Sequence, residues 1–362
     1  MPEMKRQKIT FAQAVREGID QAMTRDPSVV VIGQGVSDSK AIFNTTAQLR
    51  DMHGARRVFD MPLSENGMTG VCIGAALSGL RPVMVHQRID FVLLAMDQLV
   101  NNAAKWYYMF DGKASVPMVV RLIVGRGWGQ GPQHSQSLQA MFAHIPGLKV
   151  VMPTMAHDAK GMLIAAIEDN NPVVFIEHRW LYHISDVVPE EYYRVPLGRA
   201  HLRHQGDAVT VAAFSYMTIE ALIAAKALLA TMGVAVDVLD MRTVRPLDVD
   251  SVLTSVRKTG RLLVADTGFR TGSVAGELIS HVAEQAFDAL RTRPLRIASP
   301  DHPVPSSPFM AEGYYPGAQA IAERVLDLVG AKKEGAGYWA LCEQVAPKGA
   351  HDKPNLAFTG PF

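Results

Sequence analysis

Residues 149–177 read KVVMPTMAHDAKGMLIAAIEDNNPVVFIE, and this stretch decides the fold. It opens on an apolar run, Lys149–Met152, which Pro153 closes, and it ends on a second apolar run, Val173–Glu177. Neither run alternates polar and apolar residues, which predicts strands that are buried on both faces. The residues between them, Ala156–Glu168, predict a helix. A strand, a helix and a second buried strand in succession indicate a parallel sheet covered by helices.

The same pattern extends toward the N-terminus. Apolar residues at helical spacing predict a helix over Phe11–Arg25, with Thr10 as its N-cap. The order that follows is a strand at 29–32, a short strand at 58–61, a helix at 67–80, a strand at 82–85, a long helix at 91–108 and a strand at 118–124. For residues 1–190 the sequence therefore predicts an α/β fold with a doubly wound, mainly parallel sheet.

A second α/β series follows a change in composition. Residues 191–206 are polar and lie next to proline-punctuated sequence, which predicts a linker. Strands and helices then alternate again, which predicts a smaller α/β domain over residues 207–330. Residues 331–362 are rich in glycine, lysine and proline without clear periodicity, which predicts an extended tail.

The bulk composition excludes several classes of protein. Of the 362 residues, 48% are hydrophobic and 20% are charged, as in an ordinary globular protein, and the formal net charge is only +1. This balance argues against nucleic acid and lipid head groups as partners, and the apolar runs are too short to predict a membrane span. With Cys72 and Cys342 as the only cysteines, a disulfide framework is excluded, and a reducing cytoplasmic setting is expected.

Glu65 is the first candidate for chemistry. It lies in MPLSENGMTG (61–70), between a predicted strand and a glycine-rich predicted helix. In open parallel sheets ligands bind beyond the carboxyl ends of the strands, which is where this carboxylate is expected. The alternative is that Glu65 only occupies the first turn of a helix, a favourable place for any acidic residue. The local spacing leaves both interpretations open.

His134 is the second candidate. It follows a glycine-rich loop, GRGWGQGPQHSQS (125–137), after another predicted strand. The glycines do not have the G-x-G-x-x-G spacing of a dinucleotide site, and the chain has no Walker phosphate loop and no G-x-S-x-G elbow. A histidine presented by a loop can act as acid or base near neutral pH, or it can be an ordinary surface residue.

Together the motifs identify a family. SENGMTG (64–70), DQLVNNAAKWYYM (97–109), GPQHSQSL (131–138), PGLKVVMPTMAHDAKGML (146–163) and DVLDMRTVRPLD (237–248) occur in this order. Because of the order and spacing of these motifs, the chain resembles the β subunits of the decarboxylating component of pyruvate and branched-chain 2-oxo acid dehydrogenases. The resemblance runs from about residue 9 to residue 328. These subunits belong to the transketolase-like family.

The resemblance implies a cofactor and roles for individual residues. The cofactor is thiamine diphosphate, and Glu65 would hydrogen-bond its aminopyrimidine ring and so activate the thiazolium carbon. Phe91 would stack near the pyrimidine, and His134 would exchange protons with the substrate or acceptor. As in some relatives, a monovalent cation, K⁺, would be held near four residues at the end of a predicted helix: Ala166, Ile167, Asp169 and Asn171.

A missing motif implies a partner. Thiamine-diphosphate enzymes usually hold the diphosphate through Mg²⁺ bound by a GDG motif, and the nearest approach here is Gln205-Gly206-Asp207-Ala208. In the family an α subunit provides these ligands. The resemblance therefore implies an α2β2 heterotetramer that decarboxylates a pyruvate-like 2-oxo acid and passes the acyl group to the lipoyl domain of an acyltransferase.

Two other functions remain open at this point. One is a lipoyl-independent thiamine-diphosphate decarboxylase or ketol-transfer enzyme of a biosynthetic pathway, and the other is a non-catalytic structural subunit. The sequence departs from the family pattern at Val85-His86-Gln87-Arg88 and in the loop that holds Arg126. His86, Arg88 and Arg126 either add positive charge to the substrate mouth or form salt bridges to the α subunit.

Overall fold

The computed structural model describes residues 5–38, 42–347 and 349. The chain divides into two compact units, which are treated separately. The first takes in the described residues up to Arg126 together with Gln133–Leu197, and the second takes in Gly127–Pro132 and the described residues from Gly198 onward. Among the described residues, no helix combines the length and the apolar character that a bilayer span requires.

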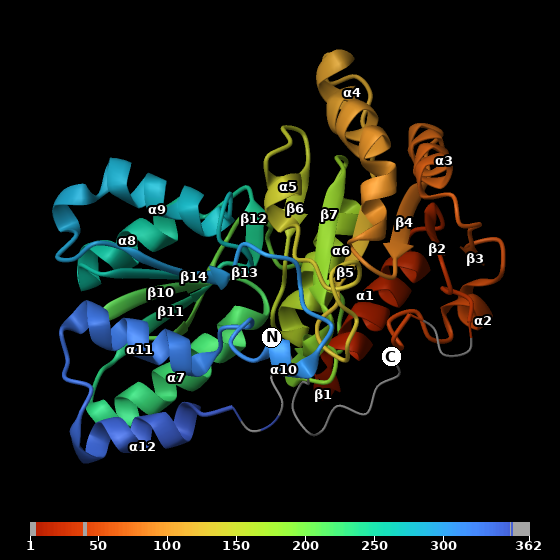
Figure 1. Ribbon diagram of the computed structural model, residues 1–362. Coiled ribbons are helices and arrows are strands. Elements are labelled where there is room, and N and C mark those ends of the chain that lie inside the picture. The colour runs from red at the N-terminus through yellow and green to blue at the C-terminus, as the bar shows by residue number, and fades with distance from the viewer. Residues whose placement is uncertain (1–4, 39–41, 348, 350–362) are drawn as a thin grey trace. The chain divides into compact units, whose positions relative to one another are not determined.

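The first unit is built on a parallel sheet (Figure 1). Its strands are ordered β6–β7–β5–β4–β2–β3, and each pairs with its neighbours in parallel. The strands of the first unit are β1 (Arg6–Thr10), β2 (Val29–Gly33), β3 (Val58–Asp60), β4 (Arg81–His86), β5 (Val119–Val124), β6 (Lys149–Val151), β7 (Val173–His178) and β8 (Ser185–Pro189). Strands β2, β5 and β7 are buried along their whole length, which confirms the predicted parallel sheet.

Helices cover this sheet, and α1 packs along α6 (Figure 1). The helical segments are α1 (Phe11–Arg25), α2 (Leu49–His53), α3 (Glu65–Leu77), η1 (Phe91–Ala95), η2 (Gln98–Ala103), α4 (Ala104–Met109), α5 (Gln139–Ala143), α6 (Ala156–Glu168) and η3 (Arg179–Leu181). Thr10 caps α1 as predicted: its Oγ1 accepts a hydrogen bond from the Gln13 N–H at 3.2 Å, and the Gln13 Oε1 accepts one from the Thr10 N–H at 2.9 Å.

Two features of the first unit differ from the sequence prediction. The predicted long helix over 91–108 consists of a 3₁₀ segment (η1), a π-helical segment (η2) and a short α-helix (α4). Strands β1 and β8 form a separate antiparallel pair that was not predicted. Their mixed polar and apolar residues carry no buried-strand pattern, and their pairing joins distant parts of the chain.

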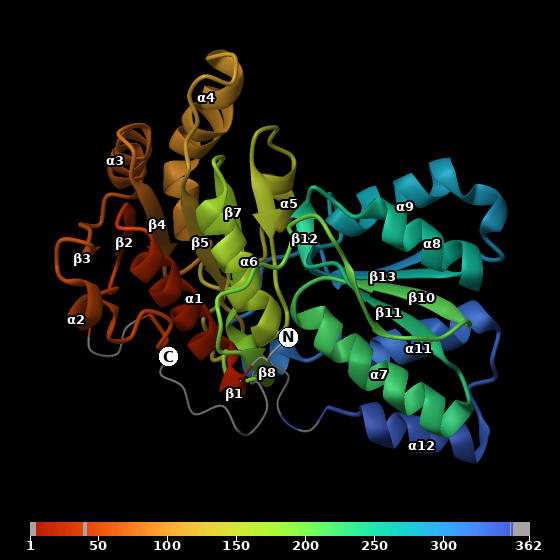
Figure 2. The same cartoon turned by 180° about the vertical axis from the view of Figure 1, so that it is seen from behind.

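The second unit is also an α/β structure, as predicted. Its sheet has the order β14–β13–β10–β11–β9, parallel except for β9. Helices α7, α11 and α12 lie on one face of the sheet, and α8 and α9 lie on the other (Figure 2). The strands are β9 (His201–His204), β10 (Val209–Ala213), β11 (Val236–Asp240), β12 (Thr243–Arg245), β13 (Leu262–Phe269) and β14 (Leu295–Ser299). The helical segments are α7 (Tyr216–Met232), α8 (Val249–Thr259), α9 (Val274–Gln285), η4 (Phe287–Ala289), α10 (Pro308–Ala311), α11 (Ala318–Val329) and α12 (Gly335–Val345).

Two predictions about connecting segments were wrong in part. Within the predicted linker 191–206, residues 201–204 form β9, a polar edge strand antiparallel to β11. Within the predicted extended tail 331–362, residues 335–345 form α12, which buries Leu341 and Val345 in the core beside α7. At position 337 the close packing of α12 requires a glycine, because a Cβ there would lie only 2.7 Å from the Thr231 carbonyl oxygen. Most of the rest of that tail, 350–362, lies outside the described residues.

Candidate active site

The candidate residues Glu65, Phe91 and His134 follow strands that end at one edge of the first unit's sheet. Because β2, β3, β4, β5 and β7 run parallel, their carboxyl ends meet at the same edge. Gln34 follows β2, Glu65 follows β3, and His86 is the last residue of β4. The loop that carries His134 follows β5. The edge therefore brings together side chains that lie far apart in the sequence.

Glu65 is the first residue of α3, two residues before the predicted start of that helix. Its side chain is buried, with 8% of the residue exposed. The Gln34 Nε2 donates a hydrogen bond of 3.0 Å to the Glu65 Oε1, and the Gln87 Nε2 donates one of 3.1 Å to the Gln34 carbonyl oxygen. A buried carboxylate at a helix N-terminus, held by one neutral amide, can accept a proton from a bound group or donate one to it.

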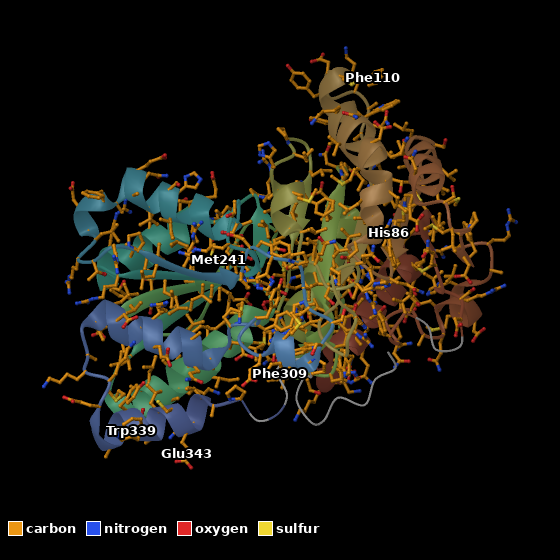
Figure 3. All side chains as sticks on the ribbon, viewed as in Figure 1. His86, Phe110, Met241, Phe309, Trp339 and Glu343 are labelled. Carbon is orange, nitrogen blue, oxygen red and sulfur yellow. The ribbon has the colours of Figure 1, made fainter. Side chains whose placement is uncertain are left out.

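His86 lies at the end of β4 and is 1% exposed (Figure 3). Its Nε2 has no hydrogen-bond partner among the residues that the structure describes. Burial lowers the pKa of His86 to about 4, although the nearby charge of Glu65 acts in the opposite direction. His86 is therefore a neutral ring beside Glu65, with a polar atom left for a partner outside the described chain.

The structure places the rings of Phe91 and His134 in contact with each other. Their ring centroids lie 5.3 Å apart, and the rings are close to perpendicular. His134 is exposed, whereas the Asp90 beside Phe91 is buried and accepts a 2.8 Å hydrogen bond from the Gln136 side chain. Burial raises the pKa of Asp90, and Gln136 and the charge of His134 oppose that effect. The structure places Phe91 at the start of η1, which packs against α3, the helix that begins at Glu65.

The arginines near this edge are buried against aromatic rings of their own unit. The Arg126 guanidinium lies 3.8 Å from the centre of the Trp180 ring, and that of Arg88 lies 5.2 Å from the centre of the Phe43 ring. Arg179 lies over the same Phe43 ring at 4.4 Å. Burial, and after it the charge of Arg88, lower the pKa of Arg179 to about 10. Arg88 and Arg126 are thus packed within this chain rather than extended into solvent.

A buried ion pair lies beneath this edge. The Arg121 Nε donates to the Glu177 Oε1 at 2.6 Å, and the Arg121 Nη2 donates to the Glu177 Oε2 at 2.9 Å. The Tyr182 hydroxyl donates a third hydrogen bond to Glu177 at 2.9 Å. Both charged side chains are inaccessible to solvent. The two-point geometry fixes β5 to β7 just below the site.

Of the predicted cation positions, Ala166 and Ile167 lie in the last turn of α6, and Asp169 and Asn171 lie in the turn before β7, at the amino ends of the strands and away from Glu65. The Arg81 Nη1 donates to the carbonyl oxygens of Ile167 and Asp169 at 3.0 and 3.1 Å, and Lys149 contacts the Asp169 carboxylate. The other two positions make bonds within the turn: the Ala166 carbonyl accepts from the Asp169 N–H, and the Asn171 N–H donates to the Asp169 side chain. These oxygen atoms are of the kind that bind a cation, but the side chains of Arg81 and Lys149 already contact those of Ile167 and Asp169. The proposed reaction therefore has no step that depends on K⁺.

The two ends of the cofactor fit this chain differently. Glu65 and the unpartnered His86 Nε2 suit the polar edge of an aminopyrimidine, and Phe91 suits its face. Mg²⁺ requires several oxygen ligands, and among the described residues no cluster of three or more His, Cys, Asp or Glu side chains is placed to hold a metal ion. The residues around Glu65 fit the pyrimidine end of the cofactor.

Several site residues were not found from the sequence. Gln34 was missed, although it directly follows a buried strand and the same rule of strand ends selected Glu65. Asp90, Gln136 and Arg179 were also missed as parts of the site. Their polar neighbours in the sequence carry no spacing that distinguishes them from surface residues.

Comparisons with known proteins identify the family of both units. Residues 7–184 match the family model of the transketolase pyrimidine binding domain, and residues 198–321 match that of the transketolase C-terminal domain. The chain is 43% identical over 325 residues to the β subunit of the acetoin:2,6-dichlorophenolindophenol oxidoreductase of Cupriavidus necator, covering 87% of this chain and 96% of that protein. Its counterpart in Bacillus subtilis is 40% identical, covering 89% and 97%.

A pyruvate dehydrogenase β subunit is a further relative. That of Rhizobium meliloti is 39% identical over 318 residues, covering 88% of this chain and 69% of that protein. Among solved structures, a split-gene transketolase in the form of an inactive β4 tetramer superposes with a TM-score of 0.73. It is 21% identical and covers 90% of this chain and 99% of that one, so this likeness concerns the fold.

Proposed function

Because the chain belongs to the transketolase-like family, with β subunits of 2-oxo acid dehydrogenases among its relatives, we propose that it is the β subunit of a thiamine-diphosphate-dependent dehydrogenase component. The observation that carries the proposal is the buried Glu65 carboxylate, held by Gln34 beside the neutral His86 at the carboxyl edge of a parallel sheet. The reaction proposed is decarboxylation of a pyruvate-like 2-oxo acid with transfer of the acyl group to a lipoyl group.

Each of four residues of this chain has its own role in the proposed reaction. Glu65 holds or takes up a proton at the ring nitrogen of the aminopyrimidine, and Gln34 fixes the orientation of its carboxylate. The Phe91 ring offers a face for stacking, and His134, in contact with Phe91, is exposed where it can exchange a proton with the substrate. When bound, thiamine diphosphate supplies the nucleophilic carbon and the electron sink.

The proposed partner is an α subunit that supplies the Mg²⁺ and diphosphate ligands. Two exposed apolar surfaces of the first unit support this. On α3, Gly67, Val71 and Gly74 share one exposed face, and a Cβ at Gly74 would meet no atom within 4 Å. At the end of α4, three apolar side chains and Phe110 are exposed, and Figure 3 labels Phe110 at this tip. The three are Tyr107, Tyr108 and Met109. Exposed apolar faces of this kind mark contacts with another chain.

A second candidate function is cleavage of a ketol, because two relatives are named for acetoin. With a 2-oxo acid, the bond from the carboxylate to the keto carbon breaks and carbon dioxide leaves. With acetoin, the bond between the carbonyl and carbinol carbons breaks and acetaldehyde leaves. In both cases the remaining two-carbon unit is oxidised by two electrons to an acetyl group, and the disulfide of the lipoyl group is reduced as it accepts that group. Carbon dioxide and acetaldehyde release by the enzyme assembled with its α subunit therefore distinguishes the two.

The test of the proposal is Glu65→Gln in that assembled enzyme. Loss of the proton-carrying carboxylate should lower turnover by about 10²–10⁴-fold or more while assembly is retained. The control is Asp51→Asn, an exposed carboxylate on α2, which should leave turnover unchanged. Near-normal turnover of Glu65→Gln would leave only a structural role. Tight Mg²⁺-dependent binding of thiamine diphosphate by the isolated chain, measured by calorimetry, would refute the need for the α subunit.

A further inference from the structure

The second unit contains an open pocket of about 690 Å³ that is lined by arginines. Arg270 follows β13, Arg293 and Arg296 lie before and within β14, and Arg324 is on α11. The remaining wall is formed by α9 and the start of β14, including Ile279 and Leu295. β14 is an edge strand of the sheet, so the pocket lies on an open side of this unit. Its volume falls within the range of about 300–1,000 Å³ typical of sites for small molecules.

The positive charge of this pocket is only partly balanced. No carboxylate lines the pocket, and among the described residues Arg270, Arg293 and Arg296 form no ion pair within 4 Å. Arg324 contacts Asp327 at 3.1 Å, but Asp327 also contacts Lys333 at 2.7 Å.

The next carboxylate, Asp301, is also engaged elsewhere. It accepts hydrogen bonds from the backbone N–H and the hydroxyl of Thr271, both at 2.8 Å. These bonds, and then the charges of Arg270 and Arg296, lower the pKa of Asp301. Asp301 therefore offsets part of the charge of two arginines, and a net positive charge remains around the pocket.

Arg296 occupies a place that favours an anion. Its Nη1 lies 3.0 Å from the position that a Cβ on Gly276 would take, so the guanidinium lies against the first turn of α9. The N-terminus of a helix carries partial positive charge, which adds to that of Arg296; the first turn of α9 also holds Glu277, but this carboxylate does not line the pocket. The glycine at 276 leaves the room for this arrangement, and the charge calls for a negatively charged ligand.

We propose that this pocket binds a small molecule that carries a diphosphate group. Each planar guanidinium can donate two parallel hydrogen bonds to phosphate oxygens, and four of them exceed what one phosphate can use. Ile279 and Leu295 provide an apolar wall for an organic group attached to the diphosphate. The site goes beyond the proposed function, because it does not involve Glu65 or the residues around it.

The test uses the full chain without its α subunit, which would bring the proposed diphosphate ligands of the active site, and without thiamine diphosphate. Calorimetry with inorganic pyrophosphate, ADP, inorganic phosphate and adenosine should give binding of the two diphosphates, weaker binding of phosphate and none of adenosine. Equal affinities for pyrophosphate and ADP would assign the site to the inorganic ion, and a preference for ADP would assign it to an organic diphosphate. The double variant Arg293→Ala/Arg296→Ala should lose at least about 100-fold in affinity.

The matched control is Arg291→Ala, an exposed arginine of the same segment that does not line the pocket. It should bind the diphosphates as the unaltered chain does, and the circular dichroism of both variants should show retained folding. Absence of diphosphate binding at millimolar concentration, or equal binding by the double variant, would overturn the proposal. Binding of polyglutamate without binding of diphosphates would also overturn it and would identify a surface for an acidic protein segment.

Discussion

His86 should make the folded protein measurably sensitive to mild acid. The ring is almost completely buried, and burial lowers its pKa to about 4 from an ordinary value of 6.5. As the pH falls below 6.5, the unfolded chain takes up a proton at this position before the folded chain does. The stability that depends on the neutral ring is therefore complete above pH 6.5 and is lost as the pH falls toward 4.

The size of the effect follows from these two pKa values. At pH 7 the difference costs the folded state only about 0.2 kcal/mol, whereas at pH 4.5 it costs about 2.5 kcal/mol. Below pH 4 the cost reaches its limit of about 3 kcal/mol. His178 is also buried, and its pKa lies well below the ordinary value, so it adds a pH dependence that is common to all variants of His86.

The assay compares the unaltered chain with His86→Leu and His86→Phe. Urea unfolding of each is followed at several pH values between 7 and 4.5, and the difference in unfolding free energy is plotted against pH. Both variants remove the titrating ring, so both should gain about 2.5 kcal/mol relative to the unaltered chain between pH 7 and pH 4.5. Parallel curves for all three proteins would refute the assignment of a neutral, buried His86. A change in only one variant would point to packing instead of titration.

Two further predictions concern the base of the site and the α3 face. Glu177→Gln should lower the unfolding free energy by about 3–5 kcal/mol in chemical denaturation, because it leaves the buried Arg121 charge without its partner. The control is Glu334→Gln, at an exposed carboxylate, which should have a far smaller effect. Equal losses of stability in the two variants would contradict the prediction. Gly74→Leu should not destabilise the isolated chain, since a Cβ there meets no atom within 4 Å. It should weaken association with the α subunit, as measured by size-exclusion chromatography. Unchanged assembly would exclude the α3 face as the contact.

The parallel sheets could be predicted because their signal is local. The buried strand β2 is apolar along its length, and β5 and β7 are apolar except for Arg121 in β5 and Glu177 and His178 in β7. The π-helical segment η2 had no such signal. Its residues keep an average helical spacing, while Asn101 and Asn102 donate side-chain hydrogen bonds to Asp97 and Gln98 one turn earlier. Such bonds are equally compatible with a regular α-helix, so the local widening could not be inferred.

The candidate site shows the same limit. Glu65 could be identified because a motif surrounds it, and His134 because it follows a glycine-rich loop. Gln34 lies 31 residues before Glu65 and follows a different strand, so only the strand order brings the two together. Burial of Arg179 and His86 likewise depends on which loops cover the sheet edge. Pairing and burial across strands are properties of the tertiary structure and leave no pattern in the adjacent sequence.

Two features of the first unit carry a free-energy cost that a partner subunit would remove. An unpartnered buried Nε2 on His86 costs about 1–3 kcal/mol, and exposure of the apolar face of α3 is a further cost. Both features belong to the region around Glu65, since α3 begins at that residue and His86 lies within reach of its charge. Neither the unpaired Nε2 nor the exposed apolar face would be expected in a chain that formed the whole site alone. A partner that covers α3 and delivers a polar ligand to the sheet edge would remove both costs at once, which makes association and cofactor binding mutually reinforcing.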